Sequence, residues 1–468
     1  MVRVIQKLYA ALPPGGRTLA ATARGLWLRR TRYGPETDRL VEEALARERW
    51  DPALWEEWRQ RRLPMVLQVA ATQVPHYRGL LLQRPALRSS FPRLENWPIL
   101  EKEELRTNPT AFLADGANRR RMVRDHTSGT TGKSLDLWFS RPTVRQWYAL
   151  FEARCRRWYG VSRHDRWGIL GGQLVTPVQQ HEPPFWVWNA PMNQLYLSSY
   201  HLAPDLIPYY VEAIRHHRLT YLLGYTSALC SIAQGILEHC HGRPEFQLKV
   251  VITNAEPLYA HQRETIARAF GCPVRETYGM AETVAAASEC EAGRLHLWPE
   301  AGIVEVLDQD SKGVPPGQAG DLVATGLLNA DMPLIRYRVG DRITLAPREE
   351  RCSCGRLLPL VKRIEGRSDD VLYTRDGRQV GRLDPVFKAS LAVREAQIIQ
   401  ESLDCIRVFY VAAPGFTAAD ASSIRSQIRQ RIGDVEVLLE PVASIPRERN
   451  GKFRSVVRRC PIPMIPRG

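Results

Sequence analysis

From about residue 98 onward, short β-type runs alternate with amphipathic helices, and this alternation constrains the fold more than any other feature of the sequence. The clearest stretch predicts strands at 221–224 and 248–252 and helices at 227–239 and 257–270. Such alternation is typical of an α/β core in which helices cover a sheet. Upstream, residues 36–72 carry apolar side chains at helical spacing, so we expect a helical cap over 1–97.

The pattern changes twice toward the C-terminus. Between 302 and 346, short strands separated by Gly and Pro turns predict a small β-rich portion that closes a large N-terminal domain, 1–366, with mixed sheets. After residues 366–370 a new α+β unit is expected, from a hairpin at 371–380, strands at 406–412 and 435–440, and a helix at 418–432. About 100 residues suffice for a separate domain, so we predict a hinge at 367–370 and a small, mobile C-terminal domain, 371–468.

The formal net charge is +15, from 65 basic and 50 acidic residues, which raises nucleic acid, anionic membranes and polyphosphate ligands as partners. Nucleic acid is not expected, because the arginines are scattered and no repeated aromatic platform accompanies them. No uncharged run is long enough for a transmembrane segment, although the basic N-terminal segment leaves peripheral membrane contact open. Pro13 and Pro14 interrupt the short apolar run at 8–12, so no secretory signal is predicted and a cytoplasmic location is expected.

Residues 127–134 form the most informative loop, in which hydroxyls, two glycines and a lysine precede a strand-like run at 135–139. Glycine lets backbone N–H groups approach an anion, the hydroxyls donate further hydrogen bonds, and lysine adds a charge. An ordinary Ser/Thr/Gly turn is the alternative interpretation. Only two residues separate Gly129 from Gly132, whereas a Walker loop requires four at this position, so a P-loop NTPase is excluded.

This loop resembles the phosphate-loop signature of the adenylate-forming superfamily of acyl ligases, and five further motifs of that family follow in order. They resemble the adenine-side loop, the tyrosine-glycine-x-x-glutamate motif, the ribose motif, the hinge and the terminal lysine motif. The six matching segments are Thr127-Ser128-Gly129-Thr130-Thr131-Gly132-Lys133, Asn254-Ala255-Glu256-Pro257, Tyr278-Gly279-Met280-Ala281-Glu282, Tyr337-Arg338-Val339-Gly340-Asp341, Gly366-Arg367-Ser368-Asp369-Asp370 and Pro446-Arg447-Glu448-Arg449-Asn450-Gly451-Lys452. Together with Cys352-Ser353-Cys354-Gly355-Arg356, the hinge looks most like that of phenylacetate–coenzyme A ligases and their capsule-biosynthesis relatives.

The resemblance implies an enzyme that joins a small-molecule carboxylic acid to the α-phosphate of ATP and then transfers the acyl group. In this comparison Glu282 is the Mg²⁺ ligand, and Asp341 accepts hydrogen bonds from both ribose hydroxyls. Tyr278 and Gly279, with Ala255, Glu256 and Pro257, are expected beside adenine, and Arg367 beside ribose or phosphate. The resemblance also implies that Lys452 is the catalytic lysine of adenylation and that Asp369 is the hinge residue.

The acyl acceptor has two candidates. Coenzyme A is implied by the ligase branch. However, the segment 376–381 lacks the glycine-valine-asparagine pattern that lies near the pantetheine tunnel in phenylacetate ligases. There and around Gln397 to Gln400 the chain resembles the capsule-type relatives, which implies an amine or hydroxyl acceptor in polysaccharide or envelope biosynthesis. Two alternatives from other classes are a basic nucleic-acid-binding protein and an inactive scaffold on a membrane surface.

Two short pairs of metal-ligating residues form a second constellation, Cys290 with His296 and Cys352 with Cys354. Three thiols and one imidazole suit a tetrahedral Zn²⁺ ion. Four protein ligands leave no open position, so the predicted ion is structural. The alternative is a set of buried cysteines with an unrelated histidine. The nine cysteines are odd in number and widely spread, which argues against a disulfide framework.

Overall fold

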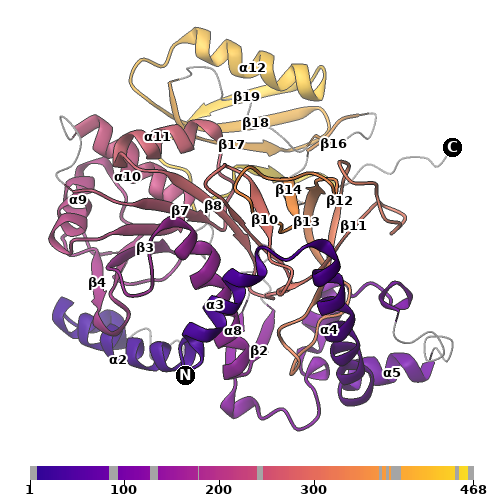
Figure 1. Ribbon diagram of the computed structural model, residues 1–468. Helices are drawn as coiled ribbons and strands as arrows, with labels where there is room; N and C mark the ends of the chain where they lie inside the picture. Colours follow the sequence, from indigo (N-terminus) through magenta and orange to yellow (C-terminus); the bar gives the residue numbers. More distant parts are fainter. Residues whose placement is uncertain are drawn as a thin grey trace. The chain divides into compact units, whose positions relative to one another are not determined.

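The structure is a computed structural model that describes residues 8–83, 93–126, 135–177, 179–239, 246–367, 372–375, 379–380, 392–447 and 453–461 (Figure 1). The chain forms two compact units, each described here by itself. The larger one consists of Met1–Val339 and Thr344–Lys362, and the smaller one of Gly340–Ile343 and Arg363–Gly468.

Helices make up the first part of the larger unit, as predicted for residues 36–72. They are α2 (Pro14–Arg32), α3 (Thr37–Arg47), α4 (Pro52–Gln73) and α5 (Pro75–Gln83). Helix α4 begins at Pro52 because the Asp51 carboxylate accepts hydrogen bonds from the backbone N–H groups of Ala53 and Leu54, both at 2.9 Å. Helix α3 packs against α8 (Arg141–Cys155) through a buried apolar cluster that includes Val41 and Ala149.

The largest sheet among the described residues is a twelve-stranded mixed sheet, in the order β11-β12-β13-β14-β10-β9-β8-β7-β6-β3-β5-β4. Most of its strands are labelled in Figure 1. The strands are β3 (Trp167–Gly171), β4 (Trp186–Asn189), β5 (Gln194–Ser198), β6 (Tyr221–Tyr225), β7 (Val250–Asn254), β8 (Val274–Gly279), β9 (Ala286–Glu289), β10 (Leu295–Leu297), β11 (Gly302–Leu307), β12 (Ala319–Gly326), β13 (Tyr337–Leu345) and β14 (Leu360–Arg367). Strands β5, β3, β6, β7 and β8 pair in parallel.

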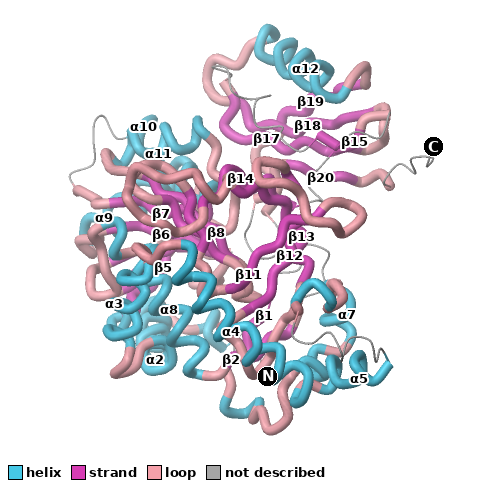
Figure 2. The backbone as a smooth tube through the Cα atoms, turned by 45° about the vertical axis from the view of Figure 1, so that its right-hand side comes forward, coloured by secondary structure: helices cyan, strands magenta, loops and turns pink. Residues whose placement is uncertain are grey.

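Three helices pack with the parallel strands and bury their apolar residues in one core (Figure 2). They are α9 (Ile207–His216), α10 (Thr226–His239) and α11 (Ala260–Phe270). Parallel strands joined by helices are the usual solution for burying near-continuous apolar runs such as Tyr221–Tyr225. The predicted α/β class is therefore confirmed. No helix among the described residues is both long enough and apolar enough to span a bilayer.

One strand differs from the sequence prediction. The strand expected at 248–252 is Val250–Asn254, because its register places Val250 opposite Tyr221 in the neighbouring parallel strand. The predicted β-rich strands after residue 302 are present, and they share a sheet with the parallel strands. Strand β9 pairs antiparallel with β8, with Ala287 opposite Tyr278, and this pairing continues the α/β sheet into the β-rich part.

The smaller unit has its own sheet, in the order β19-β18-β17-β20, and one helix. Its elements are β15 (Leu372–Tyr373), β16 (Gln379–Val380), β17 (Val393–Gln400), β18 (Cys405–Ala412), α12 (Ala418–Ile432), β19 (Glu436–Pro441) and β20 (Val456–Arg458). The predicted helix 418–432 is confirmed, and it begins with a capping box between Thr417 and Asp420. The hairpin expected at 371–380 is present as the antiparallel pair β15 and β16, whose Asp376-Gly377 turn lies outside the described residues.

Candidate active site and metal cluster

Two of the predicted motifs lie at one edge of the sheet. Strands β6, β7 and β8, which are labelled side by side in Figure 2, are parallel neighbours, so their carboxyl ends lie at the same edge. Tyr225 ends β6, Asn254 ends β7 and Gly279 ends β8. The adenine-side loop at 254–257 and the tyrosine motif at 278–282 begin at these ends. Ligands of open α/β sheets bind at the carboxyl ends of the strands, so this edge is the candidate site.

Glu256 joins the loops that follow β6 and β7. Its carboxylate accepts a hydrogen bond from the backbone N–H of Ser227 at 2.7 Å and from the Ser227 hydroxyl at 3.1 Å. Ser227 is the second residue of α10, so Glu256 caps that helix with a negative charge. Ala255 has a φ of 63°, in the left-handed region that alanine rarely adopts. Such strain persists only where surrounding contacts enforce it, and it is frequent at functional sites.

Glu282 lies in the turn after β8 and is only 6% exposed. The Tyr337 hydroxyl donates a hydrogen bond to Glu282 Oε1 at 2.9 Å, and Lys102 Nζ lies 3.6 Å from the same oxygen. A buried carboxylate needs such partners, because desolvation without them is costly. The next residue, Thr283, also has a left-handed φ, of 54°. Glu282 is thus held in one position beside the sheet edge.

Neither contact of Glu282 was predicted as part of its environment. The sequence marks Tyr337 only as the first residue of the ribose motif. Lys102 lies on α7 (Lys102–Thr107), far earlier in the chain, and no motif marks it. The tertiary fold brings the lysine to the carboxylate, and the sequence contains no short-range signal for this pairing.

The other residues predicted for adenylation are not among the residues just placed at this sheet edge. The loop 127–133, Asp369 and Lys452 lie outside the described residues. The loop's flanks are β1 (Val123–His126) and β2 (Asp136–Phe139), which pair antiparallel and are joined by an ion pair between Arg124 and Asp136 at 2.8 Å. Asp341 belongs to the smaller unit, where it lies half-buried on β13 after Gly340, whose φ is 94°. Arg367 is the last residue of β14.

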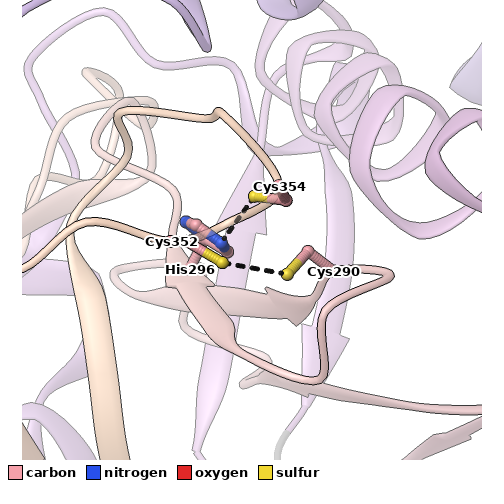
Figure 3. Close-up of side chains that lie close together, drawn as sticks. All are labelled: Cys290, His296, Cys352 and Cys354. Carbon is pink, nitrogen blue, oxygen red and sulfur yellow. Dashed lines mark hydrogen bonds between the residues drawn. The ribbon is translucent and has the colours of Figure 1, made fainter.

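The four predicted metal ligands come together in the larger unit. Cys290 follows β9, His296 lies on β10, and Cys352 and Cys354 lie in the loop before β14 (Figure 3). Their ligand atoms all lie within 4.8 Å of one another. Strand β10 pairs with both β9 and β14, and this pairing brings together two ligand pairs that are distant in sequence.

The distances in the cluster fit a tetrahedral ion. Cys290 Sγ lies 3.6 Å from Cys352 Sγ, and Cys354 Sγ lies 3.4 Å from His296 Nε2. Tetrahedral Zn²⁺ with ordinary bond lengths would separate two sulfurs by about 3.8 Å and a sulfur from a nitrogen by about 3.6 Å. The sulfur separation is also far too long for a disulfide bond. The donor set and its spacing therefore fit Zn²⁺.

The surroundings of the cluster orient the ligands. His296 Nδ1 lies 3.3 Å from the carbonyl oxygen of Leu358, which leaves Nε2 to face the thiols. Burial lowers the pKa of His296 to about 4, so the imidazole is neutral near pH 7. The Trp158 ring meets the imidazole edge-on at 5.8 Å, and Arg356 stacks over Trp158 at 4.3 Å. Arg356 and Trp158 both hydrogen-bond to Glu48, which ties the cluster to the end of α3.

Comparisons with known proteins agree with this arrangement. Residues 193–331, which carry the parallel strands and the motif loops, match the AMP-binding enzyme family. Residues 372–459 match the CapK C-terminal domain. The solved structure of 2-hydroxyisobutyryl-CoA ligase in its postadenylation state aligns with a TM-score of 0.68 at 20% identity, over 88% of this chain and 92% of that one. The fold is therefore that of adenylate-forming enzymes, and the AMP-binding match supports that superfamily for this chain.

Within the superfamily the relatives define a branch. Protein CapK of Staphylococcus aureus is 27% identical over 77% of this chain and 79% of its own length. The phenylacetate–coenzyme A ligase of Thermus thermophilus is 26% identical over 91% of this chain and 99% of its own length. These similarities support an adenylate-forming ligase of the branch that contains CapK and the phenylacetate–coenzyme A ligases.

Proposed function

We propose that the protein activates a small carboxylic acid with Mg²⁺ and ATP and transfers the acyl group to the thiol of coenzyme A. One observation carries this proposal. The motif loops after β7 and β8 share one sheet edge, where Glu282 is buried and anchored, in a chain whose AMP-binding match spans the same strands.

In the first half-reaction a carboxylate oxygen of the acid attacks the α-phosphorus of ATP. The new P–O bond forms as the bond to pyrophosphate breaks, which leaves an acyl-adenylate. Glu282 would hold Mg²⁺, which offsets phosphate charge when bound. Tyr278 and the 255–257 loop would bind adenine, Asp341 the ribose hydroxyls, and Lys133 and Lys452 the phosphate charge.

The left-handed backbone at Ala255 and the buried position of Glu282 support a site at this edge that can bind Mg²⁺ and ATP without rearrangement of these residues. A preorganised carboxylate does not have to be desolvated or reoriented during the reaction, and this is the main advantage of a fixed electrostatic site. Tyr337 and Lys102 would therefore act as positioning residues for Glu282.

In the second half-reaction the thiol sulfur attacks the acyl carbonyl. The C–S bond forms, the C–O bond to AMP breaks, and the thiol proton leaves with solvent or AMP. Three observations support coenzyme A as the acceptor. They are the similarity to phenylacetate–coenzyme A ligases, the nearly full-length alignment with one of them, and the fold shared with another coenzyme A ligase.

A second candidate acceptor is an amine or hydroxyl group of a polysaccharide precursor. It is favoured by a specific observation, the CapK C-terminal domain at 372–459 together with the similarity to CapK. The resemblance places the segment 376–381 near the pantetheine tunnel of phenylacetate ligases, and this chain lacks their glycine-valine-asparagine pattern there, which favours an acceptor other than coenzyme A. The first half-reaction is the same in both cases.

We also propose that the cluster of Cys290, His296, Cys352 and Cys354 holds a structural Zn²⁺ ion. Its distances suit the ion, and all four ligands come from the protein. The ion would join β9, β10 and the loop before β14, and would take no part in adenylation.

The test is acid-dependent exchange of pyrophosphate into ATP across a panel of carboxylic acids. Exchange with one acid class and none without acid is the expected result, and no exchange with any acid in folded, magnesium-supplied protein would contradict the adenylation proposal. The productive acid is then incubated with and without coenzyme A. Thioester and AMP in equal amounts support coenzyme A, whereas stable enzyme-bound acyl-adenylate in its presence favours the second acceptor.

A further inference from the structure

Helix α2 carries an exposed apolar stripe that the proposed chemistry does not use. Leu19 is 72% exposed and Leu26 is 51% exposed, and Trp27 beside them is 48% exposed. Leu19 and Leu26 are seven residues apart, which places them on the same side of the helix two turns apart. Leu8 and Leu12, upstream in the chain, are 66% and 37% exposed. Nearly half of the large apolar side chains that are exposed among the described residues therefore lie between 8 and 27.

The opposite side of α2 is fixed to the rest of the larger unit. Gly25, Leu28 and Thr31 are buried, and Arg17 donates a hydrogen bond to the Gln180 side chain at 2.8 Å. A Cβ atom at Gly25 would lie 1.7 Å from the side-chain oxygen of Asn189 at the end of β4, so the helix backbone makes a close approach there. Figure 1 shows α2 beside β4 at the margin of the larger unit. The apolar stripe therefore faces outward from a helix whose other side is packed against the larger unit.

The charge on this helix has one sign. Residues 8–35 contain five arginines and no Asp or Glu. Arg24, Arg29 and Arg30 are exposed, and none of the three forms an ion pair with a carboxylate within the described part of the chain. Arg30 follows Leu26 by four residues, so a cation continues the apolar stripe. Leucine and tryptophan bordered by arginine, without acidic residues, are the composition of a helix that lies in a membrane interface.

We infer that α2 is a membrane-docking surface that places the larger unit on an anionic lipid bilayer. Leu19, Leu26 and Trp27 would enter the boundary between headgroups and acyl chains, and Arg29 and Arg30 would contact lipid phosphates. A second copy of this chain fits less well, because a symmetric contact would bring like-charged arginines together. This inference does not depend on the proposed acyl transfer, and it concerns where the reaction would take place.

The experiment is co-flotation of the full chain with vesicles of phosphatidylcholine alone and of phosphatidylcholine mixed with phosphatidylglycerol. We expect binding to the mixed vesicles that weakens as salt is raised. The double variant Leu19→Glu/Leu26→Glu should reduce the partition coefficient by about tenfold or more. The double variant Arg29→Gln/Arg30→Gln should reduce it by about 25-fold, at about fivefold for each arginine.

Matched controls carry the same chemical changes elsewhere. Leu54→Glu/Leu82→Glu alters two leucines that are 43% and 67% exposed on α4 and α5, and Arg39→Gln/Arg61→Gln lowers the net charge by the same amount as the arginine variant of α2. Both controls should bind as the parent does. Thermal unfolding of every variant verifies that the fold is retained, and pyrophosphate exchange should be unchanged in all of them.

Three outcomes would overturn the inference. The first is equal flotation with the two kinds of vesicle, or none. The second is a loss of binding that is the same in the α2 variants and in their controls. The third is that the α2 variants leave flotation unchanged but abolish either binding to duplex DNA or the formation of a concentration-dependent dimer. The stripe would then serve a different partner.

Discussion

The candidate metal cluster and the candidate adenylation site are built in opposite ways. All four ligands of the cluster belong to the larger unit, on neighbouring antiparallel strands and their turns, with ligand atoms within 4.8 Å of one another. The adenylation residues are spread over loops after parallel strands, and Asp341 and Arg367 belong to the smaller unit. Sheet register alone assembles the first site. The roles proposed for the second fall on residues that the structure assigns to two separate units.

Lys452→Ala gives the strongest test of this contrast. Adenylate formation should fall by roughly 10²–10³, the loss for one transition-state charge contact. Acyl transfer from supplied acyl-adenylate should stay near normal, because the resemblance assigns this lysine to the first half-reaction only. Single-turnover measurement of each step separates the two, with Lys312→Ala as an exposed-lysine control. An equal loss in both steps would refute the assignment.

Glu282→Gln should lower pyrophosphate exchange by about a hundredfold, because the neutral amide is a poorer Mg²⁺ ligand. Exchange rates are measured at saturating Mg²⁺ and several ATP concentrations. Glu300→Gln is the matched control, since it removes a carboxylate that is similarly buried but is paired with Arg154. Unchanged exchange in Glu282→Gln would rule out the metal-binding role.

Tyr337→Phe should lower exchange by about tenfold, in line with the loss of one hydrogen bond to a charged group. The carboxylate remains, so its effect should be smaller than that of Glu282→Gln and should depend on the Mg²⁺ concentration. Tyr210→Phe, which removes a buried hydroxyl that donates to the Ser198 carbonyl at 2.8 Å, is the control and should leave exchange unaltered. A loss that is independent of Mg²⁺ would argue against a positioning role.

Cys352→Ser should have the smallest effect on adenylation and a clear effect on the fold. The parent protein, purified without chelator, should contain about one zinc per chain, and the variant should contain less and unfold at a lower temperature. Cys405→Ser, at a free and half-buried cysteine outside the cluster, should change neither quantity. Absence of zinc from the parent would refute the site, and lost exchange in folded, zinc-depleted protein would refute its purely structural role.

The sequence predicts those features that depend on short-range patterns. The α/β core, the helix at 418–432 and the two ligand pairs of the cluster follow from periodicity and spacing. The pairing of β8 with β9 was not predicted, because no local pattern distinguishes a strand that extends a sheet from one that begins another. The left-handed backbone at Ala255 was also missed, since glycine or asparagine is the usual signal for it. Lys102 reaches Glu282 only through the tertiary fold.

Strand β9 connects the two candidate sites. Its four residues, Ala286–Glu289, are all buried, and it pairs on one side with β8, which carries Tyr278, and on the other with β10, which carries His296. A one-residue shift of its register would turn every side chain of the strand to the opposite face and would move Cys290 as well. A change that displaces β9 is therefore expected to disturb both candidate sites at once, although only one residue of this strand, Glu289, bears a charge. The two candidate sites are thus coupled through residues that belong to neither.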